Sequence, residues 1–364
     1  MKFVVRLLAL NLENFRNVKE ARLSFEAPRV FLLGPNGQGK TNLLEAIGFA
    51  GVLRSFRTGG ADALVRREAR EARLFYRFAP SEAEEAEVLL GLDAKKAKTV
   101  EVDGEKISRL SDYLGRFPSV ALSSRDFRVL RDGPGERRRW LDVSLSTASG
   151  RYFEALRTYH RSLKERNALL KRGGADAELD AFEASMVPAA AEVMRLRRAS
   201  LPRLAAILAE KYALLSDSRE QASLRYLPDL EATDPGGIAE RMVASREGDR
   251  LVGSTRRGPH RDDFRFLLDE QDARHHASEG QQRGLVLALR LAEYAHLSEA
   301  RSVVPLLLVD DALGELDAAR KANFRRLLPE ESQVFGAGTA PPSDHGDSSP
   351  WQTFQVNAGS FQPS

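Results

Sequence analysis

Short apolar segments with strand-like spacing occupy the first 110 residues of the chain, and turn-forming residues separate them. Such segments predict β-strands where they are rich in Val, Phe and Leu or alternate between apolar and polar positions. The predicted strands are residues 3–10, 22–25, 30–33, 73–78 and 86–92. An Asp-Gly pair at 103–104 then separates two further β-rich segments, 99–102 and 105–107, which predicts a hairpin.

The spacing of apolar residues changes to a helical period from about residue 135. Residues 137–172 carry apolar side chains at helical spacing and end in two glycines, which predicts a helix. Residues 178–215 predict a second long helix. Pro188 and Pro202 should kink or break it, because proline cannot donate a backbone hydrogen bond.

Mixed α/β character returns near the end of the chain. The later predicted elements are a strand over 251–254, a strand over 264–268, a helix over 281–300 and a strand over 305–309.

This order of elements predicts one α/β head domain built from both ends of the chain, residues 1–124 and 246–364. A helical arm domain, residues 125–245, is inserted into it. The tail after Arg326 has no lysine or arginine and is rich in proline, glycine and serine. We therefore expect the end of this tail to be loose and solvated.

The chain has 364 residues, of which 42% are hydrophobic and 29% are charged, a composition typical of globular proteins. It contains no cysteine, which excludes disulfides, thiolate metal sites and cysteine nucleophiles. The net charge of +3 permits nucleic acid as a partner without arguing for it. No apolar run reaches the roughly 20 residues of a membrane helix. Arg6 also interrupts the apolar N-terminal stretch, so we expect a cytoplasmic protein without a membrane partner.

One eight-residue segment matches the phosphate-binding pattern GxxxxGK[ST] at every fixed position. The segment consists of Gly34, Pro35, Asn36, Gly37, Gln38, Gly39, Lys40 and Thr41. It follows the predicted strand 30–33 and opens a helical segment over 42–50, the order that a phosphate cradle requires. We expect ATP here, with Lys40 at the β- and γ-phosphates and the Thr41 hydroxyl as a ligand of Mg²⁺. The simpler interpretation is a glycine-rich turn before a helix.

A second candidate site consists of two acidic residues that directly follow an apolar strand. Residues 306–309 are Leu-Leu-Leu-Val, and Asp310 and Asp311 come next. Ligands of an open α/β sheet bind at the carboxyl ends of its strands. We therefore expect Asp310 to hold Mg²⁺ through its water shell and Asp311 to orient the attacking water. Lys40 and Asp311 are the predicted catalytic residues, although the pattern alone also fits a strand that ends in a capped turn.

A third segment, residues 278–283 with the sequence SEGQQR, precedes an apolar helix. A serine and a glycine at a helix N-terminus can bind an anion, although a plain N-cap explains the same pattern. The segment resembles the signature motif of ABC-type ATPases, usually LSGGQ, and residues 311–317 resemble their D-loop. The resemblance implies an ATP-dependent homodimer with Asp317 near its two-fold axis. The residues implied to contact the γ-phosphate bound by the second copy are Ser278, Gly280 and Gln281.

Three families of this superfamily are candidates for the family that this chain resembles. Transporter subunits usually end the acidic strand in Asp-Glu-Pro, whereas this chain has Asp-Asp-Ala at 310–312. SMC proteins insert a long coiled coil, and no long heptad run lies between Lys40 and Ser278. The chain more closely resembles the RecF family of SMC-like ABC ATPases. The similar segments are Asn14-Phe15-Arg16-Asn17, the loop GPNGQGKTN, GPGERRRWLD at 133–142 and GPHRDD at 258–263.

This resemblance implies an ABC-type P-loop ATPase head, a short helical arm and a function that composition could not indicate. RecF proteins bind ATP with Mg²⁺, dimerise with it and hydrolyse it slowly. They bind DNA near single-strand/double-strand junctions or gaps and work with RecO and RecR to load RecA. The implied processes are DNA gap repair, replication restart and SOS induction. The alternative that stays open is the ABC-type nucleotide-binding subunit of a transporter.

Two segments depart from the patterns of related proteins. Residues 335–339 (FGAGT) stand where relatives carry a γ-phosphate-sensing switch, but no histidine is present and Thr339 is a weak candidate. Residues 123–126 (SSRD) stand where ABC proteins have their Q-loop, but they include no glutamine. We therefore assign no Q-loop residue from the sequence.

Basic residues gather over residues 125–172, with 13 Lys/Arg against 6 Asp/Glu. A solvated helical face explains such a run, but the family resemblance favours a footprint for the DNA backbone. Joint replacement of Arg137, Arg138 and Arg139 should then flatten the salt dependence of DNA binding, unless these arginines pack or pair locally. The histidines without metal-ligand spacing, which we expect at a surface or interface, are His160, His275 and His276.

Overall fold

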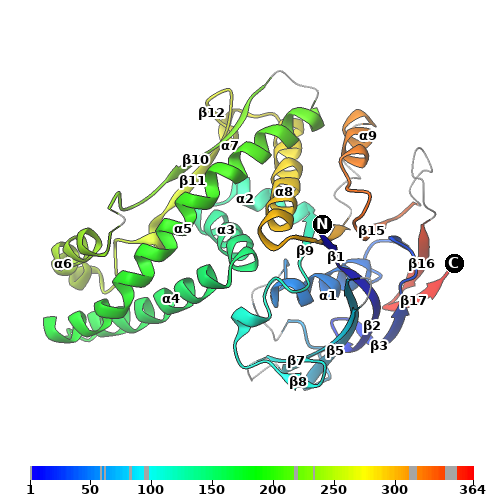
Figure 1. Cartoon of the computed structure of the whole chain (residues 1–364), viewed down its shortest axis with the longest axis horizontal. Helices are drawn as coiled ribbons and strands as arrows, with labels where there is room; N and C mark the ends of the chain where they lie inside the picture. The colour runs from blue at the N-terminus through cyan, green and yellow to red at the C-terminus, as the bar shows by residue number, and fades with distance from the viewer. Residues whose placement is uncertain are drawn as a thin grey trace. The chain divides into compact units, whose positions relative to one another are not determined.

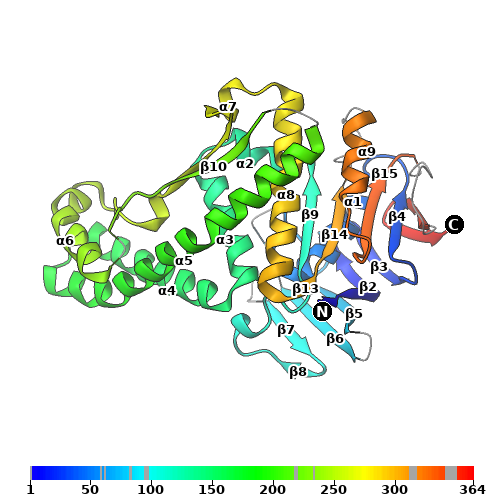
Figure 2. The same cartoon turned by 45° about the horizontal axis from the view of Figure 1, so that its top comes forward.

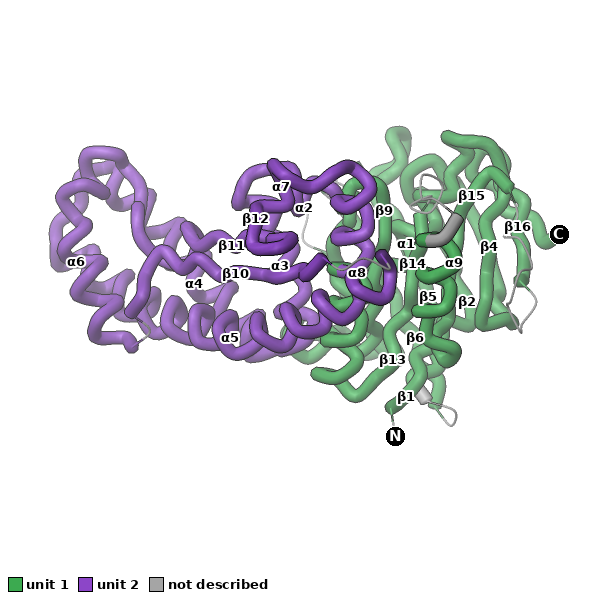
Figure 3. The backbone as a smooth tube through the Cα atoms, turned by 90° about the horizontal axis from the view of Figure 1, so that it is seen from above, with its two compact units in different colours: residues 1–126, 289–364 green, residues 127–288 purple. Residues whose placement is uncertain are grey.

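The computed structural model describes residues 2–57, 60, 63–81, 84–93, 98–216, 220–232, 234–310, 318–340 and 351–364. The chain divides into two compact units (Figure 3). The head comprises Met1–Asp126 and Leu289–Ser364, and the arm comprises Phe127–Ala288. The sequence placed the end of the arm at residue 245. The arm extends further because β11 (Asp263–Leu268) pairs with β10 (Ala222–Leu227).

The central sheet of the head has six strands in the order β17-β16-β4-β15-β14-β9. Figure 2 shows β9, β14, β15 and β4 side by side, and Figure 1 labels β16 and β17. They are β4 (Arg29–Leu33), β9 (Ser119–Ser123), β14 (Leu306–Asp310), β15 (Val334–Gly338), β16 (Gln352–Asn357) and β17 (Ser360–Pro363). All neighbours pair in parallel except β16 and β17. Helix α1 (Lys40–Val52) packs on β14, β15 and β9, and α9 (Ala318–Arg326) also belongs to the head. The leucines of β14 are buried, as in central parallel strands.

A second, antiparallel sheet of the head has the strand order β3-β2-β5-β6-β7-β8 (Figure 2). Its strands are β2 (Arg6–Phe15), β3 (Val18–Ser24), β5 (Glu71–Ser81), β6 (Glu84–Asp93), β7 (Thr99–Val102) and β8 (Glu105–Lys106). A separate pair joins β1 (Phe3–Val4) to β13 (Val303–Val304). The strands predicted before residue 110 are confirmed. The predicted hairpin turns at Asp103 and Gly104, whose φ angles of 52° and 79° both lie in the left-handed region.

The prediction of a loose tail was wrong. Strand β15 lies in the central sheet between β4 and β14, and β16 pairs with the other side of β4. The Pro-, Gly- and Ser-rich segment that dominated the prediction falls on residues 341–350, which lie outside the described residues. The apolar strands on either side of it are short, and both pair with β4, which lies about 300 residues earlier in the chain, so local composition could not reveal this pairing.

The arm combines helices with a small antiparallel sheet of β10, β11 and β12 (Gln271–Asp272). Its helices are α2 (Phe127–Arg131), α3 (Pro134–Ala148), α4 (Gly150–Lys171), α5 (Asp176–Ser216), α6 (Pro235–Val252), α7 (Ala273–His276) and the first part of α8 (Glu279–Arg301). The short 3₁₀-helices of the chain are η1 (Leu110–Asp112), η2 (Ser124–Asp126) and η3 (Pro259–Arg261). No helix within the described residues is long and apolar enough to span a membrane.

Two predicted elements of the arm differ from the structure, and a third is confirmed as a helix. The segment 137–172 forms two helices, because the extended Ser149 ends α3 and its hydroxyl accepts from the Tyr152 amide to cap α4. Helix α5 is continuous through Pro188 and Pro202, so it is not broken there, and the other expected outcome, a kink, stays a prediction. Buried residues of α5 pack against α4 and α6 and maintain the helix despite the lost hydrogen bonds. The predicted strand over 251–254 is absent: residues 251–252 end α6, and Gly253 is the C-cap of that helix.

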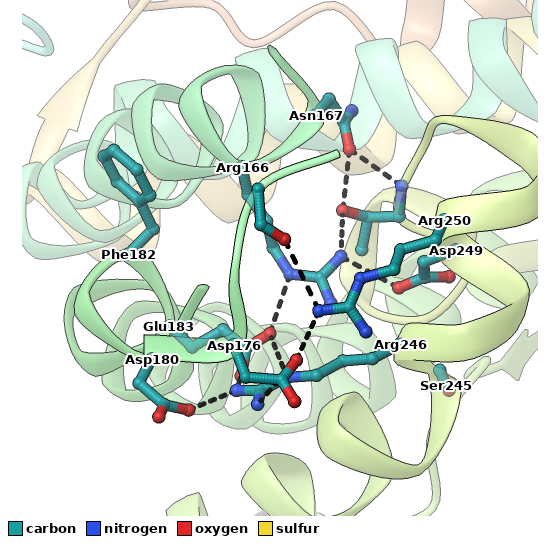
Figure 4. A network of polar contacts seen from close by, with 12 residues as sticks. Arg166, Asn167, Asp176, Asp180, Phe182, Glu183, Ser245, Arg246, Asp249 and Arg250 are labelled. Carbon is teal, nitrogen blue, oxygen red and sulfur yellow. Dashed lines mark hydrogen bonds and ion pairs between the residues drawn. The ribbon is translucent and has the colours of Figure 1, made fainter. Parts of the chain in front are cut away.

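A network of buried ions ties α4, α5 and α6 together (Figure 4). Arg166 is fully buried and donates to Glu183 at 2.9 Å and to Asp249 at 2.8 Å. Arg246 donates to the other oxygen of Glu183 at 2.5 Å and also pairs with Asp180. Buried charges require such partners because desolvation penalises an isolated ion. Part of the positive charge counted in the arm is therefore structural.

Candidate nucleotide-binding site

The phosphate loop follows β4 and leads directly into α1, so the predicted order of strand, loop and helix is present. Gly37 and Gly39 have φ angles of 80° and 116°, a left-handed conformation that glycine adopts without strain. Gly39 stands at the N-cap of α1, which begins at Lys40. The backbone amides at a helix N-terminus and the helix dipole favour an anion at this place.

The two side chains at the start of α1 have different partners. Lys40 is 7% exposed, and its Nζ donates to the carbonyl oxygens of Gly34 at 2.5 Å and Pro35 at 2.8 Å. The Thr41 hydroxyl donates to Asp310 Oδ1 at 2.8 Å, which joins the loop to the carboxyl end of β14. The structure therefore brings Lys40, Thr41 and Asp310 to one place, as the sequence predicted.

A hydroxyl and a carboxylate in contact form a donor set that fits Mg²⁺, which prefers oxygen ligands and usually retains several waters. Within the described ranges there is no group of three or more His, Cys, Asp or Glu that could hold a metal by itself. Thr41 and Asp310 would hold the cation, which would supply positive charge next to the phosphates when bound.

The predicted water-orienting residue, Asp311, lies outside the described residues, as do the whole D-loop segment 311–317 and Asp317 within it. Thr339 is exposed and directly follows β15, the strand between β4 and β14. Its assignment as a switch residue stays a prediction.

An ion cluster next to the phosphate loop was not predicted from the sequence. Glu45 of α1 is fully buried and accepts from Arg16 Nε at 2.8 Å and from Arg57 Nη1 at 3.4 Å. Arg57 also donates to Asn42 at 2.6 Å, and Asn42 donates to Asn17 at 2.7 Å. The motif Asn-Phe-Arg-Asn thus supports the first turns of α1. A carboxylate at a core position of an apolar helix was the available signal.

The C-terminal hairpin also contacts the phosphate loop, which no sequence pattern indicated. The amides of Ala358 and Gly359 donate to the side-chain and backbone oxygens of Gln38, each at 2.8 Å. A β-carbon at Gly34 would lie 2.5 Å from the Val356 carbonyl oxygen, so only glycine fits there. The turn between β16 and β17 thus fixes the loop from one side.

The signature-like segment lies in the arm and caps α8. The Ser278 amide donates to Gln281 Oε1 at 2.5 Å, and the Gln281 amide donates to Ser278 Oγ at 3.3 Å. This reciprocal pair is a capping box. Ser278 is exposed and Gly280 is half-buried, at an N-terminus that can accept an anion. A contact of these residues with nucleotide stays a prediction.

Two of the segments that resemble RecF bind each other inside the arm. Arg137 is buried and holds Asp263 in a bidentate pair at 2.7 and 3.0 Å, and Arg138 donates to the Asp262 carbonyl oxygen at 2.7 Å. The buried Asp262 carboxylate accepts from Arg197 at 2.8 Å. Local pairing, the alternative to a DNA footprint for this arginine run, is thus present at Arg137 and Arg138.

Exposed basic residues without a described acidic partner lie instead along α4. Arg161, Lys164 and Lys171 are spaced three and seven residues apart, so they share one face of this helix. His160, His275 and His276 are exposed, as expected.

The chain is similar to known proteins of one family over most of its length. A family model for the RecF/RecN/SMC N-terminal domain matches residues 6–337. The DNA replication and repair protein RecF of Synechococcus sp. (strain JA-2-3B'a(2-13)) is 34% identical over 372 residues, 98% of each chain. That of Myxococcus xanthus (strain DK1622) is 38% identical over 338 residues, 90% of this chain and 88% of the relative.

Solved structures show the same likeness. A structure of the recombination mediator protein RecF-ATPrS in the RecFOR pathway matches with a TM-score of 0.89 at 29% identity, over 100% of this chain and 99% of that chain. An Smc head domain derived from Pyrococcus furiosus matches with a TM-score of 0.54 at 15% identity, over 99% and 96% of the chains, which shows the fold alone. The α/β head therefore has the ABC-type ATPase fold, as predicted. The chain belongs to the RecF family of SMC-like ABC ATPases.

Proposed function

We propose that this protein is an ATP-dependent, DNA-binding recombination mediator that acts in DNA gap repair, replication restart and SOS induction. The observation that carries the proposal is the contact of Thr41 with Asp310 at the mouth of the phosphate loop, in a chain related to RecF over most of its length. The transporter alternative is not favoured, because the matching family is RecF/RecN/SMC.

ATP is the proposed ligand of the loop from Gly34 to Thr41. Lys40 already lies against the loop, and a short movement of its flexible side chain would give the ammonium to the β- and γ-phosphates. Thr41 and Asp310 would hold Mg²⁺, and Asp311 would orient the attacking water. ATP hydrolysis would be slow and would act as a switch.

Binding of ATP is proposed to join two copies. Ser278, Gly280 and Gln281 would contact the γ-phosphate bound by the other copy, and Asp317 would lie near the two-fold axis. The dimer would bind DNA at single-strand/double-strand junctions or gaps, and it would help RecO and RecR to load RecA there. The exposed basic face of α4 supports a contact between the arm and the phosphate backbone.

Binding of the purified protein to a gapped DNA duplex, without any membrane component, tests the function. We expect binding with ATP and much weaker binding with ADP or without nucleotide. Lys40→Ala should abolish the effect of ATP, because it removes the cation that bridges the phosphates. Lys106→Ala, an exposed lysine of the same unit, is the matched control and should bind like the wild type.

Two outcomes would contradict the proposal. One is DNA binding that ignores ATP or survives Lys40→Ala unchanged. The other is tight ATP binding without any affinity for DNA, which would favour the transporter alternative. In a second measurement, addition of RecR and RecO should accelerate RecA assembly at the gap only when the wild-type protein and ATP are present.

A further inference from the structure

Strand β9 lies beside β14 and ends level with the predicted metal ligand. The two strands run parallel, and the register pairs Ser119 with Leu306, Ala121 with Leu308 and Ser123 with Asp310. Ser123 is therefore the nearest residue to Asp310 on this neighbouring strand at the carboxyl edge of the sheet. Ligands of α/β sheets bind at this edge.

The Ser123 side chain lies on the same face of the sheet as Asp310. The Ser119 hydroxyl contacts the Gly48 carbonyl oxygen of α1 at 3.4 Å, so the first residue of β9 faces α1. Side chains alternate along a strand, and Ser123 is four positions later, which returns it to the α1 face. On β14, Asp310 faces the same side because it accepts from Thr41 of α1.

The Ser123 hydroxyl is buried and has no hydrogen-bond partner among the described residues. Ser123 as a whole residue is 6% exposed. Its backbone is fixed, since the Ser123 amide donates to Asp126 Oδ2 at 2.8 Å and Asp126 pairs with Arg290 at 2.6 Å. Buried polar atoms are rarely left without a partner, so each exception requires an explanation.

We propose that Ser123 is a positioning residue of the metal–nucleotide site: its hydroxyl binds a water molecule of the Mg²⁺ hydration shell beside Thr41 and Asp310. This inference rests on the proposed binding of Mg²⁺–ATP. A hydroxyl can donate and accept, and is neutral, so it suits a metal-bound water without repelling phosphate. Mg²⁺ usually retains several waters, whose hydrogen bonds to protein orient the ion.

The experiment is a Mg²⁺ titration of fluorescent ATP-analogue binding, with a parallel measurement in EDTA. Ser123→Ala should raise the Mg²⁺ concentration for half-maximal binding about tenfold, the lower range for lost outer-shell partners of a metal. The affinity in EDTA should not change. Ser123→Thr retains the hydroxyl and should restore the wild-type Mg²⁺ requirement. Ser123→Cys is nearly isosteric with the wild type but lacks the hard oxygen, so its Mg²⁺ requirement should rise as in Ser123→Ala. If Ser123→Ala does not fold, the Mg²⁺ requirement of Ser123→Cys tests the proposal in its place.

The matched control is Ser144→Ala. Ser144 of α3 in the arm is also buried, and its hydroxyl also lacks a described partner. Its removal should leave the Mg²⁺ requirement unchanged. Thr41→Ala is the positive control and should raise the Mg²⁺ requirement at least as much as Ser123→Ala.

The outcomes separate this inference from the proposed function. If the wild type shows no Mg²⁺-dependent nucleotide binding, the proposed function fails. If Thr41→Ala responds as expected but Ser123→Ala and Ser123→Cys titrate like the wild type, only the role of Ser123 is refuted. An equal loss of affinity with Mg²⁺ and in EDTA would also refute it, because a purely structural residue would give that result.

Discussion

Lys40 and Thr41 are neighbours in the chain, but different levels of structure determine their contacts. Lys40 binds carbonyl oxygens five and six residues earlier, within its own loop. Thr41 binds Asp310, which lies 269 residues away, so this contact exists only after the central sheet has formed. The phosphate cradle is therefore local, whereas the metal site depends on the fold.

The two adjacent acids should have separable roles. Asp310→Asn should weaken Mg²⁺-dependent ATP binding about tenfold, because it removes a charged acceptor next to Thr41. Asp311→Asn should leave ATP bound and slow hydrolysis about a hundredfold or more, as for a residue that positions or activates water. Calorimetric nucleotide affinity and phosphate release measure the two effects. Identical phenotypes would remove the assignment of separate roles.

His260 should make the stability of the protein depend on pH. Burial lowers the pKa of His260 from 6.5 to about 4, and its ring contacts Tyr159 and the Thr255 carbonyl oxygen. A depressed pKa contributes stability that is present above pH 6.5 and is lost as pH falls toward 4. The loss attributable to this residue is roughly 3 kcal/mol. Denaturant unfolding of wild type and His260→Gln across this range should show it.

The control for His260 is His275→Gln, since His275 is exposed. It should unfold with the same free energy as the wild type at pH 7. A His260→Gln variant whose unfolding free energy parallels that of the wild type from pH 6.5 to 4 would show that His260 does not take up the proton on unfolding.

In the arm, some basic side chains are buried in ion pairs, whereas others are exposed to solvent. Helix α3 carries the arginine run, and its Arg137 is committed to Asp263 in the arm interior. Helix α4 contributes Arg166 to the buried network (Figure 4). The same helix presents Arg161, Lys164 and Lys171 to solvent. A segment of the sequence that is rich in basic residues thus contains both buried, paired side chains and side chains exposed to solvent.

DNA binding should depend on the exposed face of α4. Replacement of Arg161, Lys164 and Lys171 by Gln should flatten the plot of log affinity against log salt, by about 0.9 per lost phosphate contact. Arg137→Ala should instead lower stability by about 3 kcal/mol, because it leaves the carboxylate of Asp263 without its partner. Fluorescence anisotropy at several salt concentrations and denaturant unfolding measure these effects.

Arg195→Gln is a control for the α4 replacements, because Arg195 is an exposed arginine of the arm that already pairs with Glu192. It should leave the salt dependence almost unchanged. A salt dependence that the α4 triple variant leaves intact would place the DNA contact elsewhere.

At the scale of the whole molecule, the chain passes between head and arm at two points. One is at Asp126, and the other is within α8 between Ala288 and Leu289. On the head side, Arg290 of α8 pairs with Asp126 at 2.6 Å and with Glu293 at 2.6 Å. The two connections are therefore tied to each other, directly after the strand that ends in Ser123.

ATP should convert monomers into dimers, since it would bind the dimer better than the monomer. ADP lacks the γ-phosphate and should not. Ser278→Arg places a bulky cation at an exposed helix N-terminus and should block dimerisation without weakening ATP binding to the monomer. Sedimentation with ATP and with ADP measures this. A dimer that ignores the nucleotide, or persists in Ser278→Arg, would refute the composite site.

The sequence alone determined the α/β class, most strands and helices, the phosphate loop and the family resemblance. These features rest on short-range patterns: the period of apolar residues, the Asp-Gly turn, and the glycines before Lys40. It found the helix of α5 but could not exclude a break at its prolines, because packing against α4 and α6 decides whether that helix continues.

Only the tertiary structure decided which distant residues meet. It made β15 a central strand, paired Arg137 with Asp263 and set the C-terminal hairpin against Gln38. It also placed Ser123 level with Asp310, although 186 residues lie between them. Strand register and buried ion pairs join positions far apart in the chain, and neither leaves a periodic signal in either segment. The sequence thus predicted which residues form the nucleotide site. The contacts that hold these residues in place arise only when the chain folds.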